Sequence, residues 1–450
     1  MSKPNLLELI QKYDIQGPRY TSYPTVPHWT QNFSKEQYQH TLSSLKGNST
    51  KTLALYTHIP FCEQKCYFCA CNVVITRKKE QADRYLMYLK KELSLLGPSL
   101  PSLPVTQIHW GGGTPTYLTS AQMEKLFGEY KKYFSISPNA EISLELDPRV
   151  TTLEQLKTLR QLGFNRVSLG VQDFDPKVQE AIHRHQTEEQ TRRVYEGCRE
   201  LGFSSVNMDF VYGLPFQTQD TFEENLKMIV SLGPDRLAFY NYAHVPWHVP
   251  YQKFIPEHAL PTPQLKVDLF ETALSIFKDA QYVPIGLDHF AKSTDELVCA
   301  FNERTLRRNF MGYTTQKESL LLAFGVSSIG DLDDLYVQNS RKLADYYKAL
   351  DEGKWPIAKG HVLTAEDKLR RSMIMELMCH LEVPLSWMES FEKEERELEP
   401  MVQEGFLKRD SQKLRVTELG RVFLRNIGMV FDAYLSKETL SSAKLYSRTI

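Results

Sequence analysis

The segment YTHIPFCEQKCYFCACN, residues 56–72, contains four of the seven cysteines of the chain. Cys62, Cys66 and Cys69 follow a C-x3-C-x2-C spacing, and Cys71 comes two residues later. Thiolates are soft ligands, so four of them in one short loop suit either Zn²⁺ or an iron–sulfur cluster. Structural zinc sites usually take two ligand pairs with a longer spacer, and no second pair lies near this loop. The spacing therefore favours a four-iron cluster held by three cysteines, with one iron open to another ligand.

The cysteine loop lies directly after the first of six short, apolar, β-prone runs. These runs cover residues 52–59, 106–110, 141–146, 166–171, 206–211 and 236–241. Longer amphipathic stretches lie between them, and three of these stretches run into glycine, which commonly ends a helix. Strands that alternate with helices at this spacing predict a parallel α/β sheet, either barrel-like or doubly wound.

Polar or glycine residues lie at or just after the end of each of these runs. In chain order they are His58, Gly111–Gly113, Glu145 and Asp147, Gln172 and Asp173, Asp209, and Asn241. In parallel α/β folds, ligand sites gather at the carboxyl ends of the strands. Loops are polar in any case, so one coincidence means little, but six in succession favour a shared site. The glycines let backbone groups approach a ligand closely, although a glycine triplet alone is equally typical of a tight turn.

Composition and charge exclude several classes of protein. Lys and Arg total 54 while Asp and Glu total 55, so neither a large basic surface nor a nucleic-acid partner is expected. The N-terminus lacks the apolar region of a secretory signal, and no run of about 18 apolar residues predicts a transmembrane helix. We therefore expect a cytoplasmic protein without a membrane partner. In that reducing compartment, clustered cysteines indicate metal or redox chemistry, and the scattered Cys198, Cys299 and Cys379 are interpreted as packing residues.

The sequence pattern changes after about residue 365. Residues 364–391 have a helical pattern, and residues 404–435 read as a short hairpin followed by a helix. This predicts a small C-terminal helical or winged-helix-like region. A winged helix often binds DNA, but the neutral charge balance does not support DNA binding, so we interpret this region as a packing module.

The chain resembles a known family nearly from end to end. The cysteine spacing, with Phe68 before the last cysteine, resembles the signature of radical S-adenosylmethionine (SAM) enzymes, and HWGGGTPTYL (109–118) resembles their segment for the SAM methionine. Within that superfamily the chain resembles the oxygen-independent coproporphyrinogen III oxidases. The segments that carry this resemblance are 17–25 (GPRYTSYPT), 56–72, 110–118, 145–149 (ELDPR), 164–174, 209–215 (DFVYGLP), 235–246, 286–291 (GLDHFA) and 308–316 (RNFMGYTTQ). RYTSYPT and Cys71 distinguish this family from a related haem chaperone.

The resemblance implies a fold and a set of cofactors. It implies a partial (β/α)6 TIM-like barrel over residues 46–290, with residues 1–45 as an N-terminal segment near the active site. Residues 291–364 would extend the barrel, and residues 365–450 would form a mainly helical C-terminal domain. The implied cofactors are a [4Fe–4S] cluster on Cys62, Cys66 and Cys69 and two molecules of SAM.

The resemblance also implies roles for single residues. Four residues match family positions at the cluster-bound SAM: Tyr56, Gly112, Glu145 and Ile329. Seven match positions around the second SAM: Phe68, Gly113, Thr114, Gln172, Arg184, Asp209 and Ala243. Carboxylates suit ribose hydroxyls or an ammonium group and Arg184 suits a carboxylate, although strand-end caps and surface ion pairs are the ordinary interpretation of such residues. The family reading makes Cys71 a non-ligand that activity requires, and it assigns Tyr56 and Cys71 as catalytic.

The implied reaction converts two propionates of coproporphyrinogen III to vinyl groups, which gives protoporphyrinogen IX in haem biosynthesis without O2. One electron from the cluster cleaves SAM to a 5′-deoxyadenosyl radical, which takes a β-hydrogen from each propionate. A reductant protein is the implied partner, and we expect a monomer. Four substrate carboxylates require basic groups, for which the candidates are Arg19, Arg307, Arg308 and His289. Two further residues are hypothesised to lie over the substrate or to shield a radical, Tyr20 and Tyr23.

Two alternatives stay open on the sequence alone. The first is a haem-binding chaperone that has a cluster but no oxidase activity. The second is a non-enzymatic interaction protein stabilised by zinc. The loop VPWHVPYQKFI, residues 245–255, has no assigned role.

Overall fold

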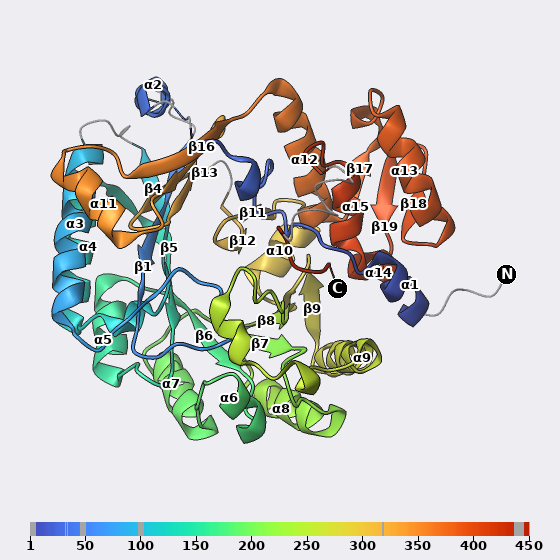
Figure 1. The fold of residues 1–450 in the computed structure, drawn as a ribbon, viewed down its shortest axis with the longest axis horizontal. Coiled ribbons are helices and arrows are strands. Elements are labelled where there is room, and N and C mark those ends of the chain that lie inside the picture. The colour runs from blue at the N-terminus through green and yellow to red at the C-terminus, as the bar shows by residue number, and fades with distance from the viewer. Residues whose placement is uncertain are drawn as a thin grey trace.

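The computed structural model describes residues 6–31, 33, 35–45, 51–97, 103–316, 319–435 and 445–449. Its centre is a curved mixed sheet with the strand order β16-β15-β14-β13-β1-β4-β5-β6-β7-β8-β10-β9 (Figure 1). The six predicted strands are all present and are parallel neighbours in chain order. They are β1 (Thr52–Ile59), β4 (Pro104–Gly112), β5 (Ser135–Leu146), β6 (Arg166–Gln172), β7 (Ser205–Tyr212) and β8 (Arg236–Asn241). The predicted α/β class with a parallel, barrel-like sheet is confirmed.

Helices connect these strands and cover the outside of the sheet, as Figure 1 shows. They are α3 (Glu80–Leu96), α4 (Ser120–Tyr133), α5 (Leu153–Leu162), α6 (Pro176–Ala181), α7 (Glu188–Glu200), α8 (Gln219–Leu232) and α9 (Pro263–Asp279). Three of them begin with a capping box in which a threonine and a glutamine bond each other's backbone, at Thr119, Thr152 and Thr187. Two end at a left-handed glycine, Gly163 and Gly233, as the glycine signals predict.

The sheet continues beyond the predicted strands at both edges. On one edge β13 (Ser319–Phe324) lies parallel to β1, and antiparallel β14 (Ile329–Asp331), β15 (Leu335–Asn339) and β16 (Ile357–Val362) follow. On the other edge β10 (His289–Lys292) and β9 (Tyr282–Ile285) add antiparallel strands to β8. The outermost strands, β16 and β9, do not pair with each other, so the barrel stays open.

A second apolar core lies in the C-terminal region, to the right in Figure 1. Its helices are α12 (Ala365–His380), α13 (Glu392–Gln403), α14 (Glu418–Val422) and α15 (Leu424–Val430). They pack with a three-stranded antiparallel sheet of β17 (Glu382–Pro384), β19 (Lys413–Val416) and β18 (Leu407–Arg409). Shorter elements complete the chain: α1 (Leu6–Tyr13), α2 (Lys35–Ser44), β2 (Phe61–Cys62), β3 (Val74–Ile75), α10 (Glu296–Asn302), β11 (Arg307–Asn309), β12 (Gly312–Thr314) and α11 (Leu343–Asp351).

Segments near the two ends of the chain, residues 15–17 and 447–449, lie side by side. Gln16 and Arg448 form an antiparallel bridge. The buried guanidinium of Arg425 donates to the carbonyls of Pro18 at 3.1 Å and Arg448 at 2.7 Å, and also to the carbonyl of Gly17. Since three backbone carbonyls from both ends share one side chain, Arg425 holds the ends in place.

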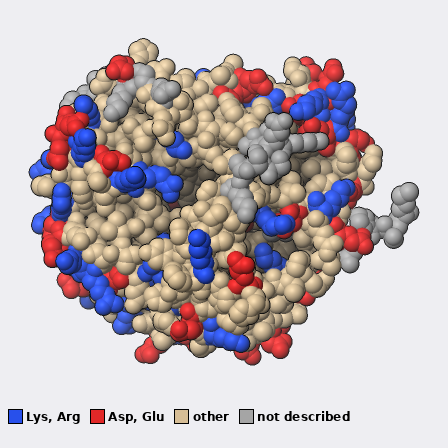
Figure 2. All heavy atoms as spheres, viewed as in Figure 1, with Lys and Arg blue, Asp and Glu red and all other residues tan. Residues whose placement is uncertain are grey.

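The remaining sequence predictions concern cysteines and charge. Cys198 and Cys379 are buried, as expected of packing residues, but Cys299 is exposed, so the prediction for Cys299 is wrong. Figure 2 shows both signs of charge scattered over the visible face. In the described part of the chain, no helix has the length and apolar character needed to cross a membrane.

Candidate active site

The cysteine loop is fixed to the barrel by backbone hydrogen bonds. The Val74 N–H donates to the Pro60 carbonyl at 2.7 Å, and the Tyr67 N–H donates to the Ile182 carbonyl at 2.9 Å. The ring of His183 bonds the Lys65 carbonyl at 2.8 Å, and the Lys65 ammonium donates to the Cys69 carbonyl at 3.0 Å. The loop is therefore ordered by contacts with the strand ends and α6.

Each of the three predicted ligand sulfurs has a polar neighbour. Cys62 Sγ lies 3.4 Å from Thr114 Oγ1, and Cys69 Sγ accepts from the Cys71 N–H at 3.4 Å. Cys66 Sγ accepts from the guanidinium groups of Arg149 at 3.5 Å and Arg184 at 3.6 Å. Donors of this kind around sulfur tune an iron–sulfur cluster.

The donor set fits an iron–sulfur cluster, because thiolates are its usual protein ligands and the guanidinium groups of Arg149 and Arg184 lie against the sulfur of Cys66. Buried Arg184 Nε and Arg149 Nη1 also have no partner in the described protein, and both belong to side chains that face these sulfurs. Unpaired buried donors of this kind suit an anionic group in the adjoining space.

On one side of the loop, Glu145 at the end of β5 is the central polar residue. Its Oε2 accepts from the Gly112 N–H at 2.9 Å, and its Oε1 lies 3.8 Å from His109 Nε2. Burial alone would raise the pKa of Glu145, but the hydrogen bond and charge of His109 and the Gly112 N–H outweigh it, so the pKa is lowered. Glu145 is thus an ionised acceptor. The neighbouring Tyr56 stacks on the His109 ring, with its hydroxyl 3.1 Å from His58 Nδ1.

The glycines after β4 are required by close packing. A Cβ on Gly112, whose φ is +116°, would lie 2.5 Å from the His58 ring, and one on Gly113 would lie 2.8 Å from the Phe61 carbonyl oxygen. The left-handed φ of Gly112 adds a second reason for glycine there. The glycine segment is therefore held against the cysteine loop, with the Gly113 N–H donating to the Ile59 carbonyl at 2.8 Å.

On the other side of the loop lie Arg184 and Asp209. Arg184 donates to the Gly170 carbonyl at 2.6 Å and pairs with Asp147 at 3.4 Å. Asp209 accepts from Asn207 at 2.7 Å. Burial raises the pKa of Asp209 to about 7, with the charge of Glu145 acting in the same direction against its hydrogen bonds. Asp209 therefore changes charge near neutral pH, whereas Glu145 does not.

These residues line two adjoining cavities. The larger, of about 550 Å³, is lined by most of the predicted site residues: Cys62, Cys66, Phe68, Cys69, Cys71, Gly112, Gly113, Thr114, Glu145, Gln172, Arg184, Asp209 and Ala243. The smaller, of about 300 Å³, is lined by Tyr56 and Ile329 and shares Cys71, Gly112 and Glu145 with the larger. The structure thus brings every predicted cofactor residue to one region at the carboxyl ends of the strands.

Of the polar residues at strand ends, Asp173 does not face either cavity. It accepts from Gln217 at 2.7 Å and from Asn225 at 2.9 Å, and burial raises its pKa to about 7. Asp173 therefore ties the loop after β6 to the next unit. The expectation of a shared site holds for the other strand ends, since His58 lines the smaller cavity and Asp147 and Asn241 line the larger.

Sequence reasoning missed Arg149, Asp147 as its partner, and Gln252. Arg149 pairs with Asp147 at 2.6 Å, and although burial alone would raise the pKa of Asp147, Arg184 and Arg149 lower it to about 2. Gln252, in the unassigned loop, donates to the carbonyls of Phe68 at 3.1 Å and Ala243 at 3.0 Å. The ELDPR segment contains both Asp147 and Arg149 and could have indicated their ion pair, whereas no sequence pattern marks Gln252.

The candidate substrate residues are dispersed. Arg19 lines the 550 Å³ cavity, and His289 lines a further cavity beside it. Arg307 is exposed, and Arg308 donates to the Tyr313 hydroxyl at 3.0 Å. Tyr20 and Tyr23 are fully buried in the second core, where their hydroxyls bond Asp432 and the Ala433 N–H. A shielding role for the two tyrosines is therefore not supported by their position.

Comparison with known proteins first defines the class. Residues 56–229 match the radical SAM superfamily, and residues 363–423 match the HemN C-terminal domain. The first match spans the cysteine loop and the strands from β4 to β7. The site is that of a radical SAM enzyme, in which a [4Fe–4S] cluster and SAM are the cofactors.

Relatives then define the family. An oxygen-independent coproporphyrinogen III oxidase of Synechocystis sp. is 43% identical over 98% of this chain and 97% of its own length. One of Escherichia coli is 41% identical over 99% and 98%. A solved structure described as the coproporphyrinogen III oxidase of Escherichia coli superposes with a TM-score of 0.90 at 40% identity, over 95% of this chain and 99% of the other. The chain belongs to the family of oxygen-independent coproporphyrinogen III oxidases.

Proposed function

We propose that the chain decarboxylates two propionate side chains of coproporphyrinogen III to vinyl groups, giving protoporphyrinogen IX without O2. Each conversion removes one hydrogen atom, one electron and CO2 from a propionate. The observation that carries the proposal is the meeting of Cys62, Cys66 and Cys69 with Glu145 and Asp209 around one cavity. The relatives of that name, which match over nearly the full chain, support the substrate.

The residues of the chain have distinct parts in this proposal. When bound, the cluster and SAM supply a carbon-centred radical that removes hydrogen from the substrate. Cys62, Cys66 and Cys69 hold the cluster, and the ionised Glu145, fixed by the Gly112 N–H, accepts from the ammonium group or ribose of SAM. Tyr56 and Ile329 line the smaller cavity, where they would contact the same SAM. Cys71 lines both cavities, where it serves catalysis without being a ligand.

We also propose that the chain binds a second molecule of SAM. The residues assigned to it all line the 550 Å³ cavity: Phe68, Gly113, Thr114, Gln172, Arg184, Asp209 and Ala243. Arg184 keeps one unpaired buried nitrogen, Nε, which suits a carboxylate. Asp209 suits ribose hydroxyls, and with its pKa near 7 it accepts them best above neutral pH.

Localisation, oligomeric state, electron donor and domain boundaries are also part of the proposal. We infer a cytoplasmic monomer that takes its electrons from a separate reductant protein. The proposed domains are residues 1–45, 46–290, 291–364 and 365–450. Most residues of the second apolar core lie in residues 373–431, which supports the last boundary, although the N-terminal segment also contributes to this core.

The decisive experiment is anaerobic turnover. The protein is reconstituted with iron and sulfide, then mixed with reductant, SAM and coproporphyrinogen III, and the products are separated by chromatography. We expect protoporphyrinogen IX together with methionine and 5′-deoxyadenosine. Tight haem binding without any vinyl product would indicate the chaperone alternative instead.

A further inference from the structure

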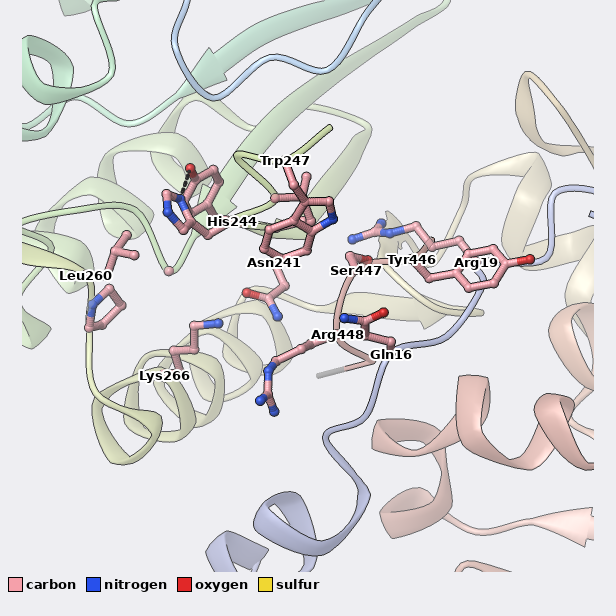
Figure 3. Close-up of a pocket in the computed structure, with 15 residues that line it drawn as sticks. Gln16, Arg19, Asn241, His244, Trp247, Leu260, Lys266, Tyr446, Ser447 and Arg448 are labelled. Atoms are coloured by element: carbon pink, nitrogen blue, oxygen red, sulfur yellow. Dashed lines mark hydrogen bonds between the residues drawn. The ribbon is translucent and has the colours of Figure 1, made fainter. Parts of the chain in front are cut away.

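A cationic cavity adjoins the cluster cavity between the barrel and the two ends of the chain (Figure 3). Its volume is about 320 Å³. It shares Arg19, Asn241, Tyr242, Ala243 and Val245 with the cluster cavity, so the two lie side by side. A group held in the cationic cavity therefore lies next to the site of radical chemistry.

The charged residues that line this cavity are all of one sign. Of its described lining residues, three are cationic, Arg19, Lys266 and Arg448, and none is acidic. Two of the cations have carboxylate partners outside the lining: Arg19 pairs with Asp288 at 2.8 Å, and Arg448 with Asp14 at 3.0 Å. The side chain of Lys266 has no hydrogen bond or ion pair with any described residue, although it is half-buried in the first turn of α9. It is the one cation of the described lining without a carboxylate at ion-pair distance.

The surroundings of Lys266 favour an anion. In Figure 3 its amine points toward Asn241 across the cavity, and Arg448 approaches from the C-terminal segment. Burial lowers the pKa of Lys266, and the charge of Arg448 lowers it further while Asp14 opposes. Two cations that repel each other beside a helix N-terminus are stabilised by a carboxylate between them.

The lining also suits the body of a flat ring. Trp247 and Tyr242 line the same cavity as the cations, and Leu260 and Pro261 add apolar surface. The adjoining third cavity, of about 390 Å³, shares Lys266 and Arg448 and is lined by Phe239, Phe270 and Leu287. Cations beside apolar and aromatic walls match a macrocycle that carries carboxylates at its rim.

We propose that Lys266 and Arg448 bind the propionate carboxylates of the substrate that are not reacting, and so set which side of the macrocycle faces the cluster. This inference rests on the proposed function, since it assumes a tetracarboxylate substrate. The bridge to Gln16 and the bond from Arg425 to the Arg448 carbonyl place Arg448 at the cavity. The ends of the chain therefore complete the substrate site.

The test compares K266M with K278M in anaerobically reconstituted holoenzyme. Lys278 lies on the same helix but is exposed at its far end. One charge-assisted hydrogen bond corresponds to roughly a 10- to 100-fold change in affinity. We expect K266M to raise the KM for coproporphyrinogen III and the Kd for the porphyrin tetra-acid by about that factor. K278M should change neither, and K266R should recover most of the loss.

Three further readouts separate this role from a structural one. The tetra-amide of the same porphyrin should bind K266M and the wild type equally, because it lacks the carboxylates. SAM cleavage in the absence of substrate should be unchanged in K266M, and R448M should show a smaller loss of the same kind. An unchanged KM in K266M, or a tetra-amide affinity that falls as much as that of the tetra-acid, would overturn the inference. Absence of vinyl product from the wild type would instead refute the proposed function itself.

Discussion

Replacing Gln252 with leucine is expected to loosen the cysteine loop without unfolding the protein. The side chain of Gln252 is 1% exposed and makes three hydrogen bonds to backbone groups. It donates to the carbonyls of Phe68 and Ala243, and its Oε1 accepts from the Val245 N–H at 2.5 Å. Leucine keeps the volume but removes all three bonds, so the cluster loop loses its tie to the segment after β8.

The magnitude follows from these contacts. A typical intramolecular hydrogen bond contributes about 0.5–1.5 kcal/mol, so three of them correspond to about 2–4 kcal/mol of local stability. That free energy is a roughly 30- to 1000-fold increase in the opening of the loop. None of its three hydrogen bonds goes to the second core or to a strand of the sheet, so the midpoint of global unfolding should move little.

Hydrogen exchange of the Val245 amide measures the opening directly, and the rate of iron loss to a chelator measures its effect on the cluster. Both should accelerate in Q252L. The matched control is Q264L, because Gln264 is exposed and bonds only Asp268 on its own helix. Equal exchange and equal iron loss in Q252L and wild type would refute the claim that Gln252 holds the loop.

Three further predictions concern the ionisable residues Glu145, Glu92 and Arg425. E145Q should retain the cluster but bind SAM roughly 10- to 100-fold more weakly, because the ionised acceptor is lost; equal affinity by calorimetry would contradict this. Burial raises the pKa of Glu92 from 4.5 to about 7, so the stability that its protonated form contributes is present below about pH 4.5 and is lost as the pH rises to about 7. Denaturant unfolding of the wild type should therefore lose about 3 kcal/mol relative to E92Q between pH 4.5 and 8, whereas parallel curves would exclude the shift. R425M should cost about 3 kcal/mol and expose both chain ends to proteolysis, since three carbonyls lose their donor, and unchanged cleavage would argue against that role.

The strands that carry the site were predictable because each is a continuous apolar run that ends in glycine or a polar residue. β13 has an equally apolar sequence, Ser319–Phe324, but no helical stretch precedes it at the regular spacing. β9 and β10 are four residues each and pair antiparallel, so they lack the strand–helix rhythm. The regular part of the sheet is thus encoded locally, and its edges are set by tertiary pairing.

The residues of the site also fall into two groups: some can be recognised in the sequence, and others are brought together only by tertiary packing. The cysteine spacing and the strand-end residues Glu145 and Asp209 are visible in the sequence, because each stands in a local pattern. Lys266 and Arg448 are far apart in the chain, and only the docking of the C-terminal segment brings them to one cavity. For Tyr20 the sequence predicted a place at the site that the structure does not give it. Tyr20 is prominent in the segment RYTSYPT, yet it packs against Gly428 and bonds Asp432 in the second core.

The central claim is that Cys62, Cys66 and Cys69 alone hold the cluster, so that its fourth iron binds SAM. Electron–nuclear double resonance of the reduced protein with ¹⁵N- and ¹³C-labelled SAM tests it in wild type and Cys71→Ser, with Cys66→Ser as control. The account predicts coupling of the label to the cluster in wild type and Cys71→Ser, and no intact cluster in Cys66→Ser. Loss of the coupling in wild type, with a cluster signal that Cys71→Ser alters, would show a fourth cysteine ligand and contradict the account.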